Sequence, residues 1–172
     1  MLLWAGHRDV RVLDGGLQAW KAAGGTVETG IVAPVAAPAA YPLGDSLVPS
    51  VDADTLQRSL GRVTVLDARA GERYRGEVEP LDKRAGHIPG ARSRFFKDNL
   101  DASGRFKPAA ELRTAFEAFG AAPDSVVHQC GSGVTACHNL LAMEAAGLAG
   151  SVLYPGSWSE WSSDPARPIA VG

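Results

Sequence analysis

The sequence predicts an α/β domain built on a small, doubly wound parallel sheet with helices on both faces. Three short apolar segments, residues 63–67, 125–129 and 151–154, have the length and β-branched content of buried strands. Residues 108–119 place apolar side chains on one helical face, and residues 134–146 form a second helical pattern that ends at a glycine. Strands that alternate with helices are typical of parallel sheets, because each crossover helix packs back onto the sheet.

The composition limits the classes of protein to consider. The chain has 172 residues, of which 45% are hydrophobic and 21% charged, and its formal net charge is −2. This balance argues against a nucleic-acid-binding arm or a basic membrane surface, and no apolar stretch approaches the roughly 18 residues of a membrane span. Residues 1–5 are apolar but too few for a secretory signal. Two cysteines cannot form a disulfide framework, which favours a reducing, cytoplasmic setting.

Residues 31–49 separate the predicted domain from an N-terminal segment. They contain four prolines and no regular period, and proline interrupts both helices and strand ladders. We therefore expect an extended linker there, with a domain over residues 50–172.

An internal similarity connects the two ends of the chain. The segment that ends at Trp20 resembles the segment that ends at Trp161, and both predict a strand, a glycine turn and a short helix with an inward tryptophan. The similarity is either a coincidence between two such units or a tandem duplication in which residues 1–30 end a first copy. Under duplication, the counterpart of Cys130 would precede the first residue, so we expect a truncated chain.

The most informative segment is the loop after the strand at residues 125–129. There Cys130 is followed by Gly-Ser-Gly, and a helix is predicted within five residues. Small residues allow a tight backbone path in which several N–H groups point at one place, and the helix adds the positive end of its dipole. We expect these groups to favour the thiolate of Cys130 and to bind an anionic sulfur or an oxyanion beside it.

Three other interpretations of this loop fit the sequence less well. A buried structural cysteine is common, but glycine at both 131 and 133 disfavours it. The sequence also fits the Gly-x-Gly-x-x-Ala pattern of dinucleotide sites, yet residues 151–156 lack the acidic residue that such sites use. A cysteine phosphatase needs arginine six residues after the cysteine, where this chain has Ala136.

The loop sequence Cys-Gly-Ser-Gly-Val-Thr resembles the active-site loop of rhodanese-type sulfurtransferases, in particular the two-domain mercaptopyruvate and thiosulfate group. The same resemblance extends to residues 66–69, 73–76, 79–80, 86–91 and 154–161. It implies a rhodanese-like fold, with residues 50–172 as the catalytic domain and residues 1–30 as the end of an inactive first domain.

The resemblance also implies a mechanism. Cys130 would take the outer sulfur of 3-mercaptopyruvate or thiosulfate as a persulfide and pass it to cyanide, a thiol or a reduced protein dithiol of the thioredoxin type. Small neutral residues after the cysteine resemble the mercaptopyruvate type, so that donor is preferred, and no metal or organic cofactor is implied. The residues expected to bind the persulfide are Gly131, Ser132, Gly133, Val134 and Thr135.

Three charged residues are candidates for binding the donor. Arg73 matches the family's substrate arginine, and a guanidinium suits a carboxylate. A second family arginine is replaced here by Leu81, and Arg84 is the candidate to substitute for it. Asp67 ends a strand where α/β sites form, and it either orients the loop or substrate or caps the next helix.

The remaining candidates are expected to be structural. Cys137 is too far along the predicted helix for a disulfide with Cys130 and is expected in the core. His128 and His138 have no partners at metal-ligand spacing. The alternative from another functional class is a non-catalytic rhodanese module that binds a partner or senses redox state through Cys130.

Overall fold

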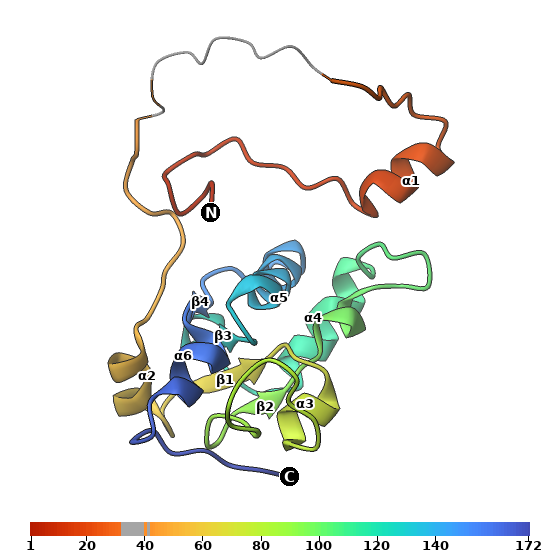
Figure 1. The fold of residues 1–172 in the computed structure, drawn as a ribbon. Coiled ribbons are helices and arrows are strands. Elements are labelled where there is room, and N and C mark those ends of the chain that lie inside the picture. Colours follow the sequence, from red (N-terminus) through yellow and green to blue (C-terminus); the bar gives the residue numbers. More distant parts are fainter. Residues whose placement is uncertain (32–39, 41) are drawn as a thin grey trace.

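The computed structural model of the chain describes residues 1–31, 40 and 42–172. At its centre is a parallel four-stranded sheet with the order β2-β1-β3-β4 (Figure 1). The strands are β1 (Thr64–Asp67), β2 (Arg92–Ser93), β3 (Val126–Gln129) and β4 (Val152–Leu153). The two central strands pair along their whole length, with Asp67 opposite Gln129. The three predicted strands are confirmed, and the two-residue β2 is too short to leave a pattern in the sequence.

Helices cover both faces of the sheet, as predicted. The helices α2 (Ala53–Ser59) and α6 (Ser157–Ser163) pack on one face, and α4 (Ala109–Glu117) and α5 (Val134–Ala145) pack on the other. The short helix α3 (Gly71–Arg75) follows β1. Two 3-10 turns, η1 (Phe96–Asn99) and η2 (Pro123–Ser125), and the N-terminal helix α1 (Gly16–Ala22) complete the elements.

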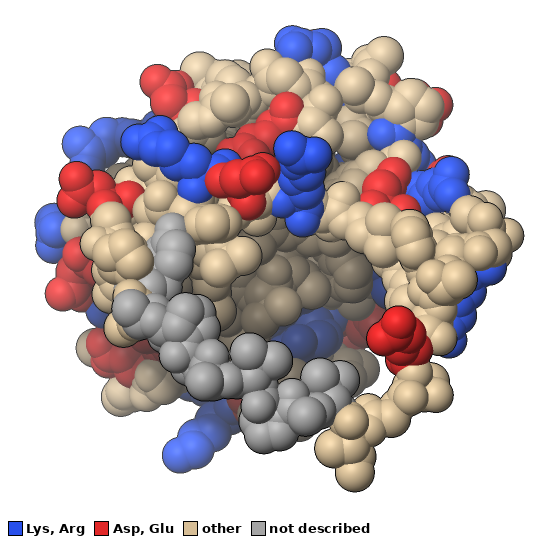
Figure 2. Space-filling model, turned by 90° about the horizontal axis from the view of Figure 1, so that it is seen from above, with Lys and Arg blue, Asp and Glu red and all other residues tan. Residues whose placement is uncertain are grey.

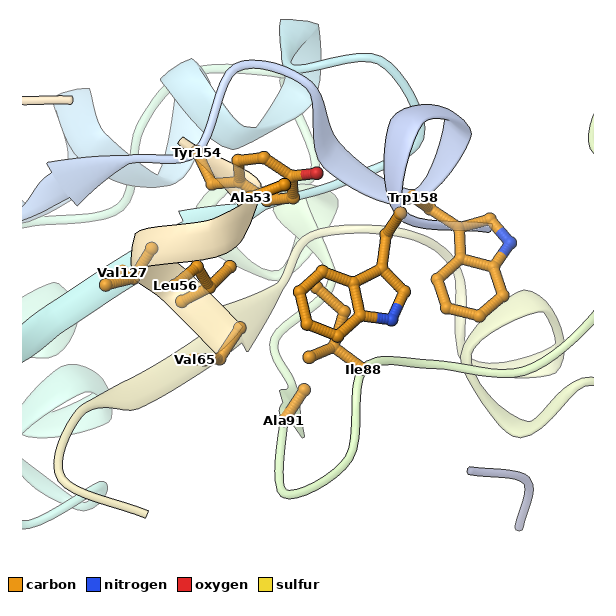
Figure 3. Packing of buried hydrophobic residues seen from close by; sticks show 9 residues of the cluster. Ala53, Leu56, Val65, Ile88, Ala91, Val127, Tyr154 and Trp158 are labelled. Carbon is orange, nitrogen blue, oxygen red and sulfur yellow. The ribbon is translucent and has the colours of Figure 1, made fainter. Parts of the chain in front are cut away.

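Alternation along the central strands assigns their side chains to two cores. The first core lies under α2 and α6, and Figure 3 shows Leu56, Val65, Val127 and Trp158 converging there. Trp158 and Trp161 are both fully buried. Burial of large aromatic rings supplies much of the hydrophobic free energy that fixes α6 against the sheet.

The second core lies between the opposite face and the helices α4 and α5. Leu66 and Val126 from the strands meet Leu112 and Phe116 from α4 and Met143 from α5. Leu112 and Phe116 are on the helical face that the sequence predicted to be apolar. The carboxyl end of β3 lies between the two cores, at the junction of α5 and α6. The loop of Cys130 begins there.

The N-terminal segment contains α1 but no strand, and the prediction that Trp20 points inward is wrong. Trp20 is 44% exposed and its indole N–H donates to the Thr26 carbonyl, whereas Trp161 is fully buried. The segment touches the domain where the amide of Phe106 donates to Asp14 Oδ1. The tryptophans differ because Trp161 has a sheet to pack on, whereas the described contacts of α1 give Trp20 none.

Part of the predicted linker, residues 32–39 and 41, lies outside the described residues. From residue 42 onward no helix or strand forms before the domain. At the end of the linker, the amide of Val51 donates to the carbonyl of Leu153, which adds this segment beside β4.

Candidate active site

The loop of Cys130 is fixed at both ends by regular structure. It leaves β3 after Gln129 and enters α5 at Val134, and the Cys130 residue is only 2% exposed. Gly133 caps the helix with φ +80°, and a Cβ at this position would lie 2.5 Å from the carbonyl oxygen of Pro155. Only glycine can adopt this positive φ and lie this close to Pro155 without strain, which explains why residue 133 is a glycine.

The start of α6 binds the other side of the loop. The amides of Trp158 and Ser159 donate to the carbonyls of Cys130 and Gly131, each over 2.9 Å. The amide of Cys130 donates to Ser157 Oγ over 3.1 Å, and that hydroxyl donates to the Tyr154 carbonyl. Ser157 adopts φ +53°, a conformation that costs a non-glycine residue energy and here places its hydroxyl under the cysteine.

These bonds leave a group of amides unused. Within the part of the chain that the structure describes, no N–H of residues 131–135 donates to a protein acceptor. They include the first amides of α5, which have no partner within the helix. The free amides and the end of the helix place several N–H groups and a partial positive charge directly after Cys130, an arrangement that suits an anion.

A cavity of about 320 Å³ opens onto this loop. It is lined by Ala68, Arg69, Ala70, Arg73, Leu81, Phe95, Phe96, Cys130, Gly131, Ser132, Val134, Thr135 and Ser159. All predicted loop residues except Gly133 line it, and so does Arg73. Its size suits a donor of a few heavy atoms together with the cysteine side chain.

Arg73 reaches the cavity from α3. Its Nη2 atom is 2.6 Å from Glu79 Oε1 and 3.5 Å from Asp82 Oδ2. Its Nη1 atom lies 3.4 Å from the place a Cβ would take at Gly131, and it makes no hydrogen bond to the described residues. One end of the guanidinium is thus held by carboxylates, while the other faces the residue after Cys130.

Asp67 does not line the cavity, and its role is to hold a second arginine. Its carboxylate is fully buried and accepts a hydrogen bond from Arg69 Nη2 over 2.7 Å and from the Arg69 amide over 2.9 Å. It does not cap the next helix, whose N-terminal cap is Ala70 without a side-chain bond. The guanidinium of Arg69 also stacks on Trp158 at 4.8 Å, which links the wall of the cavity to the first core.

Glu79 joins the two arginines into one network. It is 3.3 Å from Arg69 Nη1 as well as 2.6 Å from Arg73 Nη2. Burial would raise the pKa of Glu79, but the hydrogen bond from Arg73 and the amides of Leu81 and Asp82 lower it below its usual value. The ionised carboxylate therefore holds Arg73 in position at neutral pH.

Two predicted placements are wrong. The guanidinium of Arg84 does not reach the cavity, because it donates to the carbonyls of Asp164 and Arg167 and so ties its loop to the segment after α6. Cys137 is exposed and not in the core, because its position on α5 faces away from the sheet. It lines a separate apolar cavity of about 570 Å³ with residues that include Trp4 and Leu153.

Several residues of the cavity were not found from the sequence. Arg69 follows a strand end and carried a usable signal, because side chains at that edge of a parallel sheet gather at one site. Phe95, Phe96 and Ser159 come from segments far away along the chain, and no local pattern indicates their place. Only the folded structure brings them to Cys130.

Three observations concern the molecule as a whole. Seen from the side of the N-terminal segment, the molecule is hollowed near its middle, and charges of both signs surround the hollow (Figure 2). Among the described residues, no three side chains of His, Cys, Asp or Glu gather as a metal site would require. No helix in the described part of the chain is long and apolar enough to cross a membrane.

Comparison with known families identifies the domain. The family model of the rhodanese-like domain matches residues 52–164, which contain the sheet, the loop of Cys130 and all of α6. The chain belongs to the rhodanese-like domain family. The two cores, the cavity and the loop after β3 are therefore features of a rhodanese-like domain.

Named relatives of this rhodanese-like chain are sulfurtransferases. It is 50% identical over 177 residues to a probable 3-mercaptopyruvate sulfurtransferase of Pseudomonas aeruginosa and 43% identical over 175 residues to a putative thiosulfate sulfurtransferase of Mycobacterium tuberculosis. Both alignments cover all of this chain but only 62% and 61% of the relatives. The chain thus spans about three fifths of their length.

The solved structures agree on the fold. The wild-type structure of EanB matches with a TM-score of 0.89 at 26% identity, covering 99% of this chain and 43% of that one. An anaerobic ergothioneine biosynthesis enzyme from Chlorobium limicola matches with a TM-score of 0.86 at 25% identity, with the same coverage.

Proposed function

We propose that the chain carries the sulfur-transferring part of a sulfurtransferase, in which Cys130 accepts a sulfane sulfur as a persulfide. The observation that carries the proposal is the loop itself: a buried cysteine at the end of a strand, followed by amides that have no protein acceptor among the described residues. A persulfide ionises readily, and its terminal sulfur would bind to the amides of residues 131–135.

The donor of this reaction is a small anion. With 3-mercaptopyruvate, the Cys130 thiolate attacks the donor sulfur, the sulfur–carbon bond breaks, and its electron pair goes to the leaving carbon as the enolate of pyruvate. The carbon gains one proton and the new persulfide loses one, so a thiolate and a thiol become a persulfide anion and pyruvate. With thiosulfate, the sulfur–sulfur bond breaks and sulfite leaves with the electron pair.

The charges around the cavity favour the monocarboxylate donor. Arg73 offers one free guanidinium end, while Arg69 is engaged by Asp67 and Glu79. The carboxylates of Glu79 and Asp82 lie against Arg73 and would repel a dianion more strongly than a monoanion. The neutral residues 131–135 add no cation. Similarity to the Pseudomonas aeruginosa relative supports the same donor.

Persulfide chemistry has support from the solved relatives. One structure of EanB, 25% identical to this chain with a TM-score of 0.86, is described as ergothioneine covalently linked to a persulfide cysteine. For this chain the second half-reaction would pass the outer sulfur to a thiol, cyanide or a reduced protein dithiol, which regenerates the Cys130 thiolate.

The surrounding protein is also part of the proposal. Residues 1–30 would be the last part of a first rhodanese-like domain, since α1 follows a glycine turn as α6 does and leaves Leu17 and Trp20 exposed. Relatives that extend beyond this chain are consistent with that reading. The proposed location is reducing and cytoplasmic, and the two free thiols support it.

Mass spectrometry after incubation with each donor tests the function. Sulfur transfer adds about 32 Da to a cysteine, and we expect this gain with 3-mercaptopyruvate on the wild type and on Cys137→Ala but not on Cys130→Ala. The Cys137 variant is the matched control, since these are the two cysteines of the sequence. A thiol acceptor should then remove the added mass. If neither donor modifies Cys130, the non-catalytic binding module becomes the better explanation.

A further inference from the structure

Ser159 is a cavity residue that the proposed reaction has not used. It belongs to the first turn of α6 and lines the same cavity as Cys130 and Arg73. Its amide donates to the Gly131 carbonyl over 2.9 Å, which holds the residue against the loop. Its hydroxyl makes no hydrogen bond with the described part of the chain, although the hydroxyl of Ser163 on the same helix donates to the Glu160 carbonyl.

Two residues with polar side chains therefore flank Gly131. Arg73 Nη1 lies 3.4 Å from the position of a Cβ on this glycine, and the backbone amide of Ser159 donates to its carbonyl. The two belong to α3 and α6, which are separated along the sequence, and both line the cavity at this loop. A donor bound beside Cys130 would have a cation available from one helix and a neutral hydroxyl from the other.

We infer that Ser159 is a catalytic residue that donates its hydroxyl to the keto oxygen of an α-keto acid donor, next to the carboxylate bound by Arg73. The inference rests on the proposed function. The keto oxygen of such a donor takes up negative charge as the sulfur–carbon bond breaks and the enolate forms. A hydroxyl positioned at this oxygen binds the enolate more strongly than the ketone, and so it accelerates the step.

The contact also distinguishes donors. Thiosulfate has no carbonyl group, and the sulfite that leaves already carries its charge on several equivalent oxygens. A hydroxyl aimed at one keto oxygen therefore contributes more to an α-keto acid donor than to thiosulfate. Ser159 then acts on selectivity as well as on rate, independently of the neutral residues after Cys130.

The test compares Ser159→Ala, Ser159→Thr and Ser163→Ala with the wild type using 3-mercaptopyruvate and thiosulfate. We expect Ser159→Ala to lower kcat/KM for 3-mercaptopyruvate about tenfold, mainly in kcat, and to leave kcat/KM for thiosulfate within about twofold. Ser159→Thr keeps a hydroxyl and should recover most of the loss, and Ser163→Ala should match the wild type with both donors. Equal loss with both donors, or no loss with 3-mercaptopyruvate, overturns the inference.

A binding measurement separates this inference from the function on which it depends. Pyruvate, the ketone product, should slow the alkylation of Cys130 by iodoacetamide, and Ser159→Ala should weaken that protection several-fold while Ser163→Ala does not. This measurement needs no sulfur transfer. If Cys130 forms no persulfide but pyruvate protection still depends on Ser159, the hydroxyl contact stands and the proposed function fails. If pyruvate protects the wild type and Ser159→Ala equally, the contact is wrong.

Discussion

The guanidinium of Arg73 lies against Gly131, with Nη1 3.4 Å from the place where a side chain would begin at that residue. The approach depends on α3 for the arginine and on the loop after β3 for the glycine. A larger residue after Cys130 would force the guanidinium to move away. The absence of a side chain at Gly131 and the position of the cation are therefore linked.

Arg73→Gln should weaken donor binding. Losing a charged hydrogen bond to a carboxylate costs about 1.5–3 kcal/mol, or roughly a 10- to 100-fold loss in kcat/KM for 3-mercaptopyruvate, seen mostly in KM. Steady-state kinetics checks this, and Arg75→Gln on the same helix is the control, because Arg75 is half exposed and pairs with Glu77. Sulfur delivery from a preformed persulfide should change little. Equal losses in both half-reactions would remove Arg73 from the donor site.

Gly133→Ala should distort the active-site loop. The backbone has φ +80°, and the new Cβ would lie 2.5 Å from the Pro155 carbonyl oxygen, so strain and a steric clash add together. We expect a loss of unfolding free energy of more than about 2 kcal/mol and a strong drop in persulfide formation. Urea denaturation and mass spectrometry measure the two effects.

Gly120→Ala is the matched control for this experiment. Gly120 has φ +68°, but a Cβ there would meet no atom within 4 Å. Gly120→Ala should therefore lose only the unfolding free energy that a non-glycine residue loses at positive φ, about 1–2 kcal/mol. Persulfide formation should not change. A Gly133 variant no worse than the Gly120 variant would contradict the role of the contact with Pro155.

Ser157→Ala should destabilise the loop because it removes the acceptor for the buried Cys130 amide. The Cys130 amide donates to Ser157 Oγ over 3.1 Å. A buried N–H that loses its acceptor costs about 1–3 kcal/mol of stability. Denaturant unfolding should show this loss, together with faster alkylation of Cys130 as the loop opens. Ser163→Ala, on the exposed side of α6, should change stability by less than about 0.5 kcal/mol. Equal stability of the two variants would count against the proposed support of the loop.

His128 should make the domain sensitive to acid. Burial lowers its pKa to about 3 from an ordinary value of 6.5. The ring lies in the second core, where Nδ1 has no partner among the described residues and Nε2 is 3.2 Å from Met143 Sδ. The unfolded chain therefore binds a proton below pH 6.5 that the folded chain does not. The contribution of His128 to stability is complete above pH 6.5 and declines by up to about 1.4 kcal/mol per pH unit as the pH falls toward 3.

A neutral replacement, His128→Gln, isolates this effect. The variant should be less stable near pH 7, because a buried ring is lost, but its unfolding free energy should fall less steeply between pH 6 and pH 4. Urea denaturation across this range gives the difference in slope. Parallel curves for the two proteins would mean that the ring is protonated without cost in the folded state.

The sequence by itself determined the alternation of strands and helices and the place of the loop that carries the cysteine. These features depend on neighbours along the chain: apolar periodicity, and glycines between a strand and a helix. For this reason the positions of β1, β3, α4 and α5 were predicted within about a residue or two.

Only the tertiary structure decided which side chains reach Cys130. Arg73 and Arg84 are eleven residues apart and look alike in the sequence, yet one lines the cavity and the other binds the carbonyls of residues 164 and 167. Trp20 and Trp161 share a local pattern, but only Trp161 has a sheet to pack against. The use of Ser157 and Ser159 likewise depends on α6 meeting the loop. Such contacts join distant segments, and their geometry is set by packing in the cores, which no local pattern encodes.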